Sequence, residues 1–148
     1  MTLPKRNDFK AAAIVAATVL AIAGSGALAL TRQRDDSADP RGWPAIAGMD
    51  TRAVIELARR LPLSESASPD QPWCDHSAEV AQVLSHDFDE ERVASGGGGT
   101  VLWGSDLTGT WTMVLERPDA TSCVVASGVG YRDGASPRHF FTSAGLSG

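Results

Sequence analysis

The stretch from Asp75 to Glu91 is rich in carboxyl and imidazole groups, which bind metal ions or transfer protons. His76 and His86 are ten residues apart, so on one helix they lie about 15 Å apart and on different sides. They cannot share an ion unless another element contributes. A solvated, charged helix end accounts for the same residues, and we predict neither a metal nor a cofactor.

A calcium loop is the second chemistry that this stretch suggests. Asp87, Asp89 and Glu91 alternate as calcium ligands do. However, Arg92 stands where the sharp turn of such a loop requires glycine, and no acidic residue closes the loop. The pattern therefore argues against calcium binding.

Catalytic patterns are equally incomplete. Glu90 and Asp106 are a conceivable carboxylate pair for glycoside cleavage, but nothing in the sequence brings them together. No serine lies in a G-x-S-x-G elbow, and the glycine run 96–99 precedes a predicted strand without a following Lys-Ser or Lys-Thr. We read that run as a flexible crossing from helix to sheet. The sequence thus favours a non-catalytic domain.

Tryptophans offer a different kind of site. Trp103 and Trp111 would form a stacking platform if both faced water, but Trp111 aligns with Met113 and Leu115, which favours the core. For Trp103 the sequence does not decide between the core and the solvent-exposed face. The weak candidates for binding are therefore Trp103, Asp106 and Glu90.

These residues are positioned by three predicted strands. Residues 100–104, 110–116 and 121–127 carry apolar side chains in alternation, and turns at 105–109 and 117–120 connect them. A bare sheet of this size is marginal in water, so a helix must cover its apolar face.

Two helices are predicted before the sheet. Asp50 or Thr51 begins the first, which ends at Pro62. Asp75 or Ser77 begins the second, over 76–88, whose apolar residues recur at helical spacing: Val80, Val83, Leu84 and Phe88. We expect this second helix to cover the sheet, giving an α+β fold of one or two helices on a small three-stranded antiparallel meander.

Cys74 and Cys123 are the only cysteines, and both lie in the part that would be exported. An even count in an oxidising compartment favours a disulfide, whereas two cysteines so far apart make no zinc pattern. The bond is expected to fasten the second helix to the last strand. Two buried free thiols remain the alternative if the protein is cytosolic.

The N-terminus resembles an export signal. Basic residues precede an uncharged stretch, 11–30, whose Ala27-Leu28-Ala29 offers small residues for cleavage after Ala29. An uncleaved anchor in the inner membrane is the alternative, and a buried helix of a cytosolic domain is the third reading. We divide the chain into a signal peptide or membrane anchor (1–29), a linker (30–49), an α+β domain (50–130) and a flexible C-terminal tail (131–148).

Charge excludes one class of partner. After Ala29 the chain has ten arginines, no lysine, and seventeen Asp and Glu, a net charge of −7. A phosphate backbone or an anionic membrane surface would be repelled by this surplus. We therefore expect no nucleic acid, and contact with membrane only through the N-terminal segment.

One resemblance adds to this. The sequences WC at 73–74, FDE at 88–90, GTWT at 109–112 and SCVVASG at 122–128 resemble a family of small exported bacterial proteins, over about residues 73–130. The resemblance implies export, the cysteine pair and compactness, and it carries no activity or catalytic residue.

The hypothesis from sequence is an exported envelope domain, periplasmic or extracellular, that binds or supports another envelope protein. The alternatives are a periplasmic inhibitor or small-ligand binder, using the turn 105–109 or the outer face of the sheet, and a cell-wall hydrolase.

Overall fold

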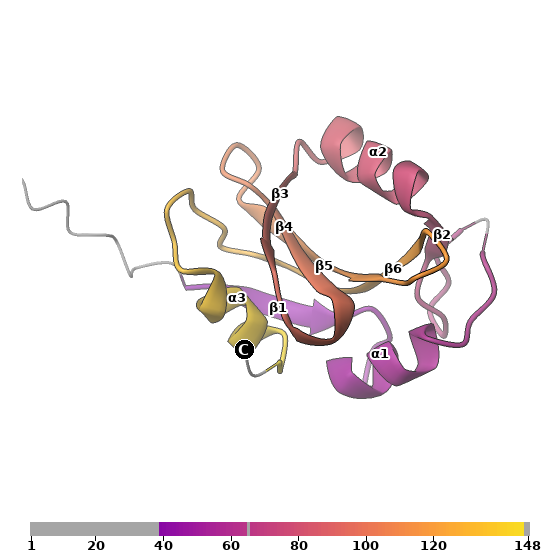
Figure 1. Ribbon diagram of the computed structural model, residues 1–148. Helices are drawn as coiled ribbons and strands as arrows, with labels where there is room; N and C mark the ends of the chain where they lie inside the picture. Colours follow the sequence, from indigo (N-terminus) through magenta and orange to yellow (C-terminus); the bar gives the residue numbers. More distant parts are fainter. Residues whose placement is uncertain (1–38, 65, 147–148) are drawn as a thin grey trace, which may run out of the picture. The chain divides into compact units, whose positions relative to one another are not determined.

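The computed structural model describes residues 39–64 and 66–146 (Figure 1). The predicted signal or anchor at 1–29 lies outside the described residues. The elements in chain order are β1 (Arg41–Pro44), α1 (Thr51–Ala58), β2 (Cys74–His76), α2 (Ser77–Asp87), β3 (Glu91–Ser95), the short 3-10 turn η1 (Gly97–Gly99), β4 (Thr100–Ser105), β5 (Thr110–Glu116), β6 (Thr121–Val129) and α3 (Pro137–Ser143). No helix of this described part is long and apolar enough to cross a membrane.

Within these residues the strands form one sheet of six, in the order β1-β6-β5-β4-β3, and every paired neighbour is antiparallel. β2 pairs with the first residues of β6 and β1 with the last, so the two short strands extend the sheet beyond β6. The α+β class is confirmed, but the three-stranded meander is wrong. β4, β5 and β6 are the centre of a wider sheet.

The central strands follow their predicted alternation. β5 has the predicted bounds, and Trp111, Met113 and Leu115 are fully buried on one side of it. β6 carries a bulge where the register shifts between Met113 and Val114, and this leaves both Val125 and Ala126 in the same buried cluster. We call this side of the sheet the core face.

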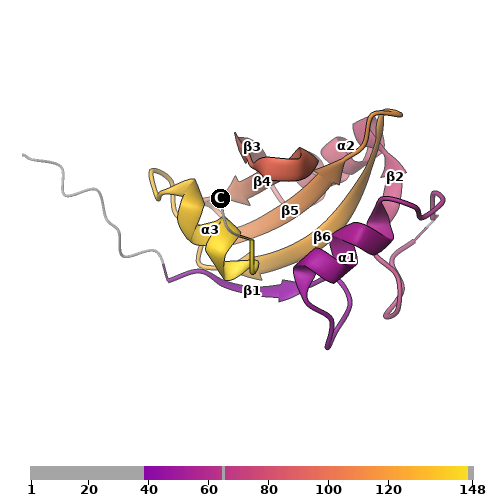
Figure 2. The same cartoon turned by 60° about the horizontal axis from the view of Figure 1, so that its bottom comes forward.

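Two helices cover the core face. Val54, Ile55 and Ala58 of α1 and Phe140 and Phe141 of α3 belong to one buried cluster with the core-face strands. Figure 1 shows α1 and α3 below the sheet and α2 above it, and Figure 2 shows the same division from another side. The Trp111 and Phe140 rings meet edge to face, with centroids 6.0 Å apart.

Glycines make room for Trp111. Gly104 and Gly128 flank it on the neighbouring strands, and Gly42 is paired with Gly128. A Cβ added to Gly42 would lie 2.4 Å from the Trp111 ring, and one on Gly128 would lie 2.6 Å from it. The large ring therefore lies flat over backbone that carries no side chain.

α2 covers the opposite side, which we call the groove face. Val80 and Leu84 pack on Val114, with Trp73, Trp103 and Val124 around them. The prediction that α2 covers Trp111 and Cys123 is therefore wrong. Alternation shows which residues share a face of a strand, but it does not show which helix covers that face.

The starts of the two predicted helices differ in their capping. Asp50 caps α1 as predicted, since its Oδ1 accepts the Ala53 N–H at 3.0 Å. α2 begins after His76, which makes no side-chain cap bond. The Asp75 carboxylate instead accepts the His76 N–H at 2.7 Å.

The glycine run is a turn, not a crossing from helix to sheet. Residues 91–95, for which no strand was predicted, form the edge strand β3, and the run returns the chain to β4. The Gly96 N–H donates to the Thr100 carbonyl at 2.8 Å, and Gly98 and Gly99 have φ of 68° and 85°. Glycine adopts these angles without strain.

The boundaries of the domain also need correction. The predicted linker 30–49 contains β1, and Ile46 is buried in the core. Residues 131–146 are not a flexible tail, because they form α3 and bury Phe140 and Phe141. α3 ends in a Schellman motif: Gly145 has φ of 75°, and the Leu146 N–H donates to the Phe141 carbonyl at 2.8 Å.

Candidate functional site

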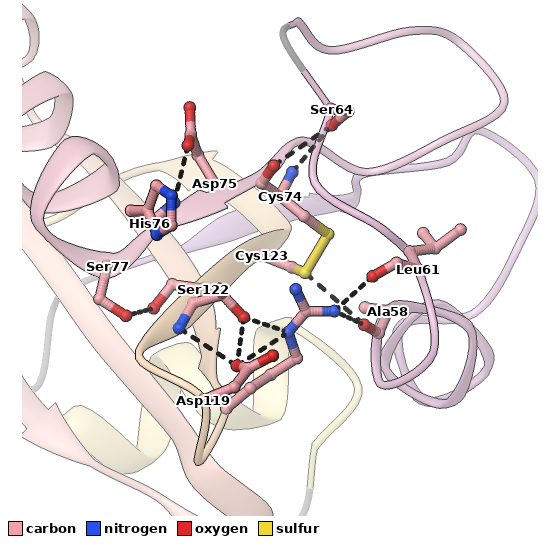
Figure 3. The surroundings of a disulfide bond; sticks show 12 residues. Ala58, Leu61, Ser64, Cys74, Asp75, His76, Ser77, Asp119, Ser122 and Cys123 are labelled. Carbon is pink, nitrogen blue, oxygen red and sulfur yellow. Dashed lines mark hydrogen bonds and ion pairs between the residues drawn. A yellow bond between two sulfur atoms is a disulfide. The ribbon is translucent and has the colours of Figure 1, made fainter.

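The disulfide is a structural element. Cys74 and Cys123 are bonded, face each other across β2 and β6 with Cα atoms 4.0 Å apart, and are fully buried (Figure 3). The predicted pair is confirmed. The bond joins neighbouring strands and does not fasten α2 to the sheet, as we had expected, because Cys74 belongs to β2 and Cys123 faces the core.

The chain around the bond is held by polar contacts. The Ser64 N–H donates to the Cys74 carbonyl at 2.8 Å, and the Cys74 N–H donates to the Ser64 Oγ at 3.1 Å. Arg117 donates to the carbonyls of Ala58 and Leu61 at the end of α1, at 3.0 and 2.6 Å. Because the sulfurs are buried and their neighbours are satisfied, we assign the bond to folding and look elsewhere for function.

A groove of about 500 Å³ lies on the groove face. Its lining comes from three places. Thr112, Val124 and Ser127 of the sheet form its floor, and Val83, Leu84 and Phe88 form the wall on the α2 side. The third side, which we call the loop wall, belongs to the connection between α1 and β2, together with Ala45 just after β1. The loop-wall residues of that connection are Ser66, Ala67, Ser68, Gln71, Pro72 and Trp73. None of the lining residues in the described part of the chain carries a charge, so the interior is mainly apolar.

The groove exists because α2 covers only part of this face. Val80 and Leu84 are buried against the sheet, whereas Phe88 at the end of the helix is 48 % exposed. The sequence pattern placed all four apolar residues of the helix in the core. The excess of apolar residues over what the sheet buries is the signal that could have indicated a binding surface.

The groove walls have an uneven charge. From Leu61 to Glu91 the sequence has eight Asp and Glu and neither lysine nor arginine. This segment supplies both the loop wall and the α2 wall. Glu79 and Asp87 lie one helical turn on either side of the lining residue Val83, and Asp70 and Asp89 are chain neighbours of the lining residues Gln71 and Phe88, so exposed carboxylates flank the apolar lining.

Glu90 lies at the end of this segment and is almost completely buried, with 1 % of its surface exposed. The chain turns at Asp89, whose φ is 56°, and the Glu90 N–H donates to the Leu84 carbonyl at 2.9 Å. The Thr110 hydroxyl donates to Oε1 at 2.9 Å, while Oε2 has no partner in the described chain. Burial raises the pKa of the Glu90 carboxyl, and the hydroxyls of Thr112 and Thr110 oppose part of the rise.

Trp103 packs beside α2, and its buried Nε1 also lacks a partner among the described residues. Its strand neighbour is Thr112, which lies on the groove floor and whose other neighbour is Ser127. Trp43 pairs with Ser127 in turn and is 55 % exposed. The core position favoured for Trp111 is confirmed, and the alternative platform with Trp103 is excluded because the two residues lie on opposite faces of the sheet. Trp43, an exposed tryptophan that was not among the predicted binding residues, lies next to the groove floor.

Asp106 lies apart from these groups. It is exposed in the turn between β4 and β5, and its Oδ1 accepts the Asp133 N–H at 3.1 Å. No hydrogen bond joins it to Glu90 in the described part of the chain, so the two carboxyl groups have different partners. No three histidine, cysteine or acidic side chains within residues 39–64 and 66–146 are grouped to hold a metal ion.

Comparison with known proteins adds no assignment: no protein-family model, no curated protein and no solved structure matches this chain.

Proposed function

We propose that this chain is an exported, non-catalytic envelope domain that holds a segment of another protein in the groove between α2 and the sheet. The observation that carries the proposal is the groove itself, with an apolar interior of about 500 Å³ and Phe88 exposed at its edge. Apolar grooves with exposed aromatic rings at their edge are typical of interaction sites.

Export is supported by two independent features. The N-terminal segment has the order of a signal or anchor, and a buried disulfide is compatible with an oxidising compartment. The resemblance over residues 73–130 points the same way.

Intact mass of the protein from its source organism tests export directly. We expect removal of the first 29 residues (cleavage after Ala29), together with the mass of an oxidised cysteine pair. A mass that retains the N-terminus supports the inner-membrane anchor instead. Free thiols in the native protein would contradict export in either form.

Photo-crosslinking tests the groove. A photoreactive phenylalanine analogue at position 88 of the full chain, in its source organism, is expected to give a discrete adduct with one envelope protein. Val83→Trp, which fills the groove, should abolish the adduct. Gln82→Trp is the matched control, because Gln82 is exposed on the same helix and does not line the groove. Equal adducts in both variants would overturn the proposal.

A second candidate is the inhibitor reading, which the turn 105–109 supports. Leu107 is 82 % exposed at this turn, and a projecting apolar side chain is able to enter a pocket of a partner. A crosslinker at position 107 that captures the envelope protein, while one at position 88 does not, would favour this candidate over the groove.

A further inference from the structure

We propose that the occupant of the groove is a cationic amphipathic protein segment, with a few apolar side chains in the groove and Lys or Arg residues on either side of them. This inference rests on the proposed function and adds the chemistry of the partner. It is carried by the charge of the walls, the apolar lining and the two exposed aromatic rings.

The wall carboxylates lie outside the arginine ion pairs found in the described chain. The exposed carboxylates on or next to the walls are Asp70, Glu79, Asp87 and Asp89. In the described chain, the arginine ion pairs join other residues: Arg59 with Glu56, Arg92 with Glu116, and Arg117 with Asp119. The Asp87 carboxylate lies 3.2 Å from Nδ1 of the neighbouring His86. An approaching cationic segment would be attracted, and an anionic one would be repelled.

The lining of the groove determines which side chains of the partner lie inside it. Since none of the described lining residues is charged, a Lys or Arg head placed among them would lose its hydration without gaining an opposite charge. Apolar side chains of the partner therefore occupy the interior, and its cations lie outside, where the carboxylates are. The same surplus of negative charge disfavours phosphate groups and anionic lipid.

Exposed aromatic rings give the cations a second kind of partner. Phe88 lines the groove and is 48 % exposed, and Trp43, 55 % exposed, is paired with Ser127 on the groove floor. Lys and Arg bind to the faces of such rings through cation–π interactions of about 0.5–1 kcal/mol at exposed sites. Both rings lie beside an apolar space, so one segment is able to use the ring and the groove together.

The experiment begins with peptides that depend on the groove. A random peptide library is panned against the protein as isolated from its source organism, with the disulfide intact, and counter-selected on the Val83→Trp variant. If no peptide distinguishes the two proteins, the proposed function fails and this inference fails with it. Peptides that bind wild type and the Gln82→Trp control, but not Val83→Trp, sustain the groove.

The charge is then tested on those peptides. Each is synthesised with its apolar residues unchanged and with flanking Lys, Ser or Glu. We expect the Lys form to bind at least about tenfold more tightly than the Glu form at low ionic strength, with the difference shrinking as salt is added. Equal affinities, or a preference for Glu, would overturn the cationic partner and leave the groove function standing.

Charge variants of the protein give the reciprocal test. Glu79→Gln combined with Asp87→Asn should weaken the Lys form severalfold and leave the Ser form unchanged. Glu56→Gln combined with Asp133→Asn removes the same charge from residues that do not line the groove or lie on α2, and should change neither. Displacement of the peptides by neutral phosphatidylcholine vesicles would identify an acyl chain as the occupant and would also overturn the inference.

Discussion

The two faces of the sheet use alternate residues of the same strands, but one face is closed and the other is half open. On the core face Trp111, Met113 and Leu115 are fully buried under α1 and α3. On the groove face α2 buries Val114 and leaves Thr112 on the floor of a groove. The difference separates the part of the molecule that stabilises the fold from the part that is available to a partner.

Geometry explains the difference. A sheet five strands wide, β1-β6-β5-β4-β3, spans about 20 Å at the usual strand spacing of about 4.8 Å. A helix with its side chains is about 10 Å across. Two helices therefore cover the core face, while α2 alone covers about half of the groove face.

Truncation of one aromatic residue on each face tests this division. Trp111→Ala should lower the free energy of unfolding by about 3–5 kcal/mol, since it opens a cavity in the closed core. Phe88→Ala should lower it by less than about 1 kcal/mol, because the ring is half exposed. Urea unfolding followed by circular dichroism measures both. Similar losses from the two variants would show that the groove face also stabilises the fold, and Trp111→Phe provides a milder variant if Trp111→Ala does not fold.

Removal of the disulfide should have the next largest effect. The bond closes a loop with a sequence separation of 49, for which the chain-entropy model gives a loss of about 4 kcal/mol as an upper value. Cys74→Ala with Cys123→Ala should lower the denaturation midpoint of the oxidised protein accordingly. Adding a reductant should lower the midpoint of wild type and leave the double variant unchanged. An unchanged midpoint in the double variant would show that the buried bond contributes nothing to stability.

Overpacking of the core face gives a smaller effect. A Cβ on Gly128 would lie 2.1 Å from the Arg41 carbonyl oxygen and 2.6 Å from the Trp111 ring. Gly128→Ala should therefore lower the free energy of unfolding by about 1–3 kcal/mol. Gly97→Ala is the control, since nothing lies within 4 Å of the added atom. Equal thermal midpoints for the two variants would contradict the close packing around Trp111.

The smallest expected effect concerns Glu90 and has the opposite sign. Its folded pKa is raised above the ordinary value of 4.5, so its contribution to stability is full below that pH and is lost as the pH rises through the folded pKa. Glu90→Gln, which stays neutral, should increase the free energy of unfolding at pH 7, because it removes a carboxylate whose charged form is disfavoured by burial.

A pH series separates this effect from that of Asp119. The pKa of Asp119 is lowered from 3.8 by the hydrogen bond from Thr121, so its contribution is lost only as the pH falls below that value. The difference between wild type and Glu90→Gln should therefore grow from pH 4.5 to 7. Exposed Glu91→Gln is the control. A constant difference over this range would contradict the assignment to Glu90.

Local pattern predicted several elements correctly. The alternation over 110–116 indicated both the bounds of β5 and the burial of Trp111, because a period of two places alternate residues on one face. Asp50 was one of the two cap candidates for α1, with Thr51, that residue type indicated, and the structure shows that it is the cap. Such features depend on a few neighbouring residues, so the sequence is sufficient for them.

Edge elements were missed for a common reason. β1 reads RGWP and β3 reads ERVAS, and neither carries an apolar alternation of its own. They are strands because β6 and β4 offer them hydrogen bonds.

α3 was missed for a different reason. It had a detectable signal, Pro137 at its start and Gly145 after its end, but the surrounding Gly and Ser residues suggested a flexible tail.

The candidate site was the least predictable part. Glu90 and Trp103 were noted for their residue types, yet the groove is formed by a loop, a helix and three strand residues distant in the sequence. No period or motif relates Val83 to Ser127. Only the packing of α2 on the sheet brings them together.

By itself, the sequence determined the central strands, the main helix and the existence of a cysteine pair, since propensity, alternation and residue count are local or compositional properties. The tertiary structure alone decided which face each helix covers, that Cys74 lies on a strand opposite Cys123, and that an apolar groove stays open beside acidic walls. These features depend on which strands pair and on how wide the paired sheet is relative to the helices that cover it. The width of the sheet is set only when all the strands are paired.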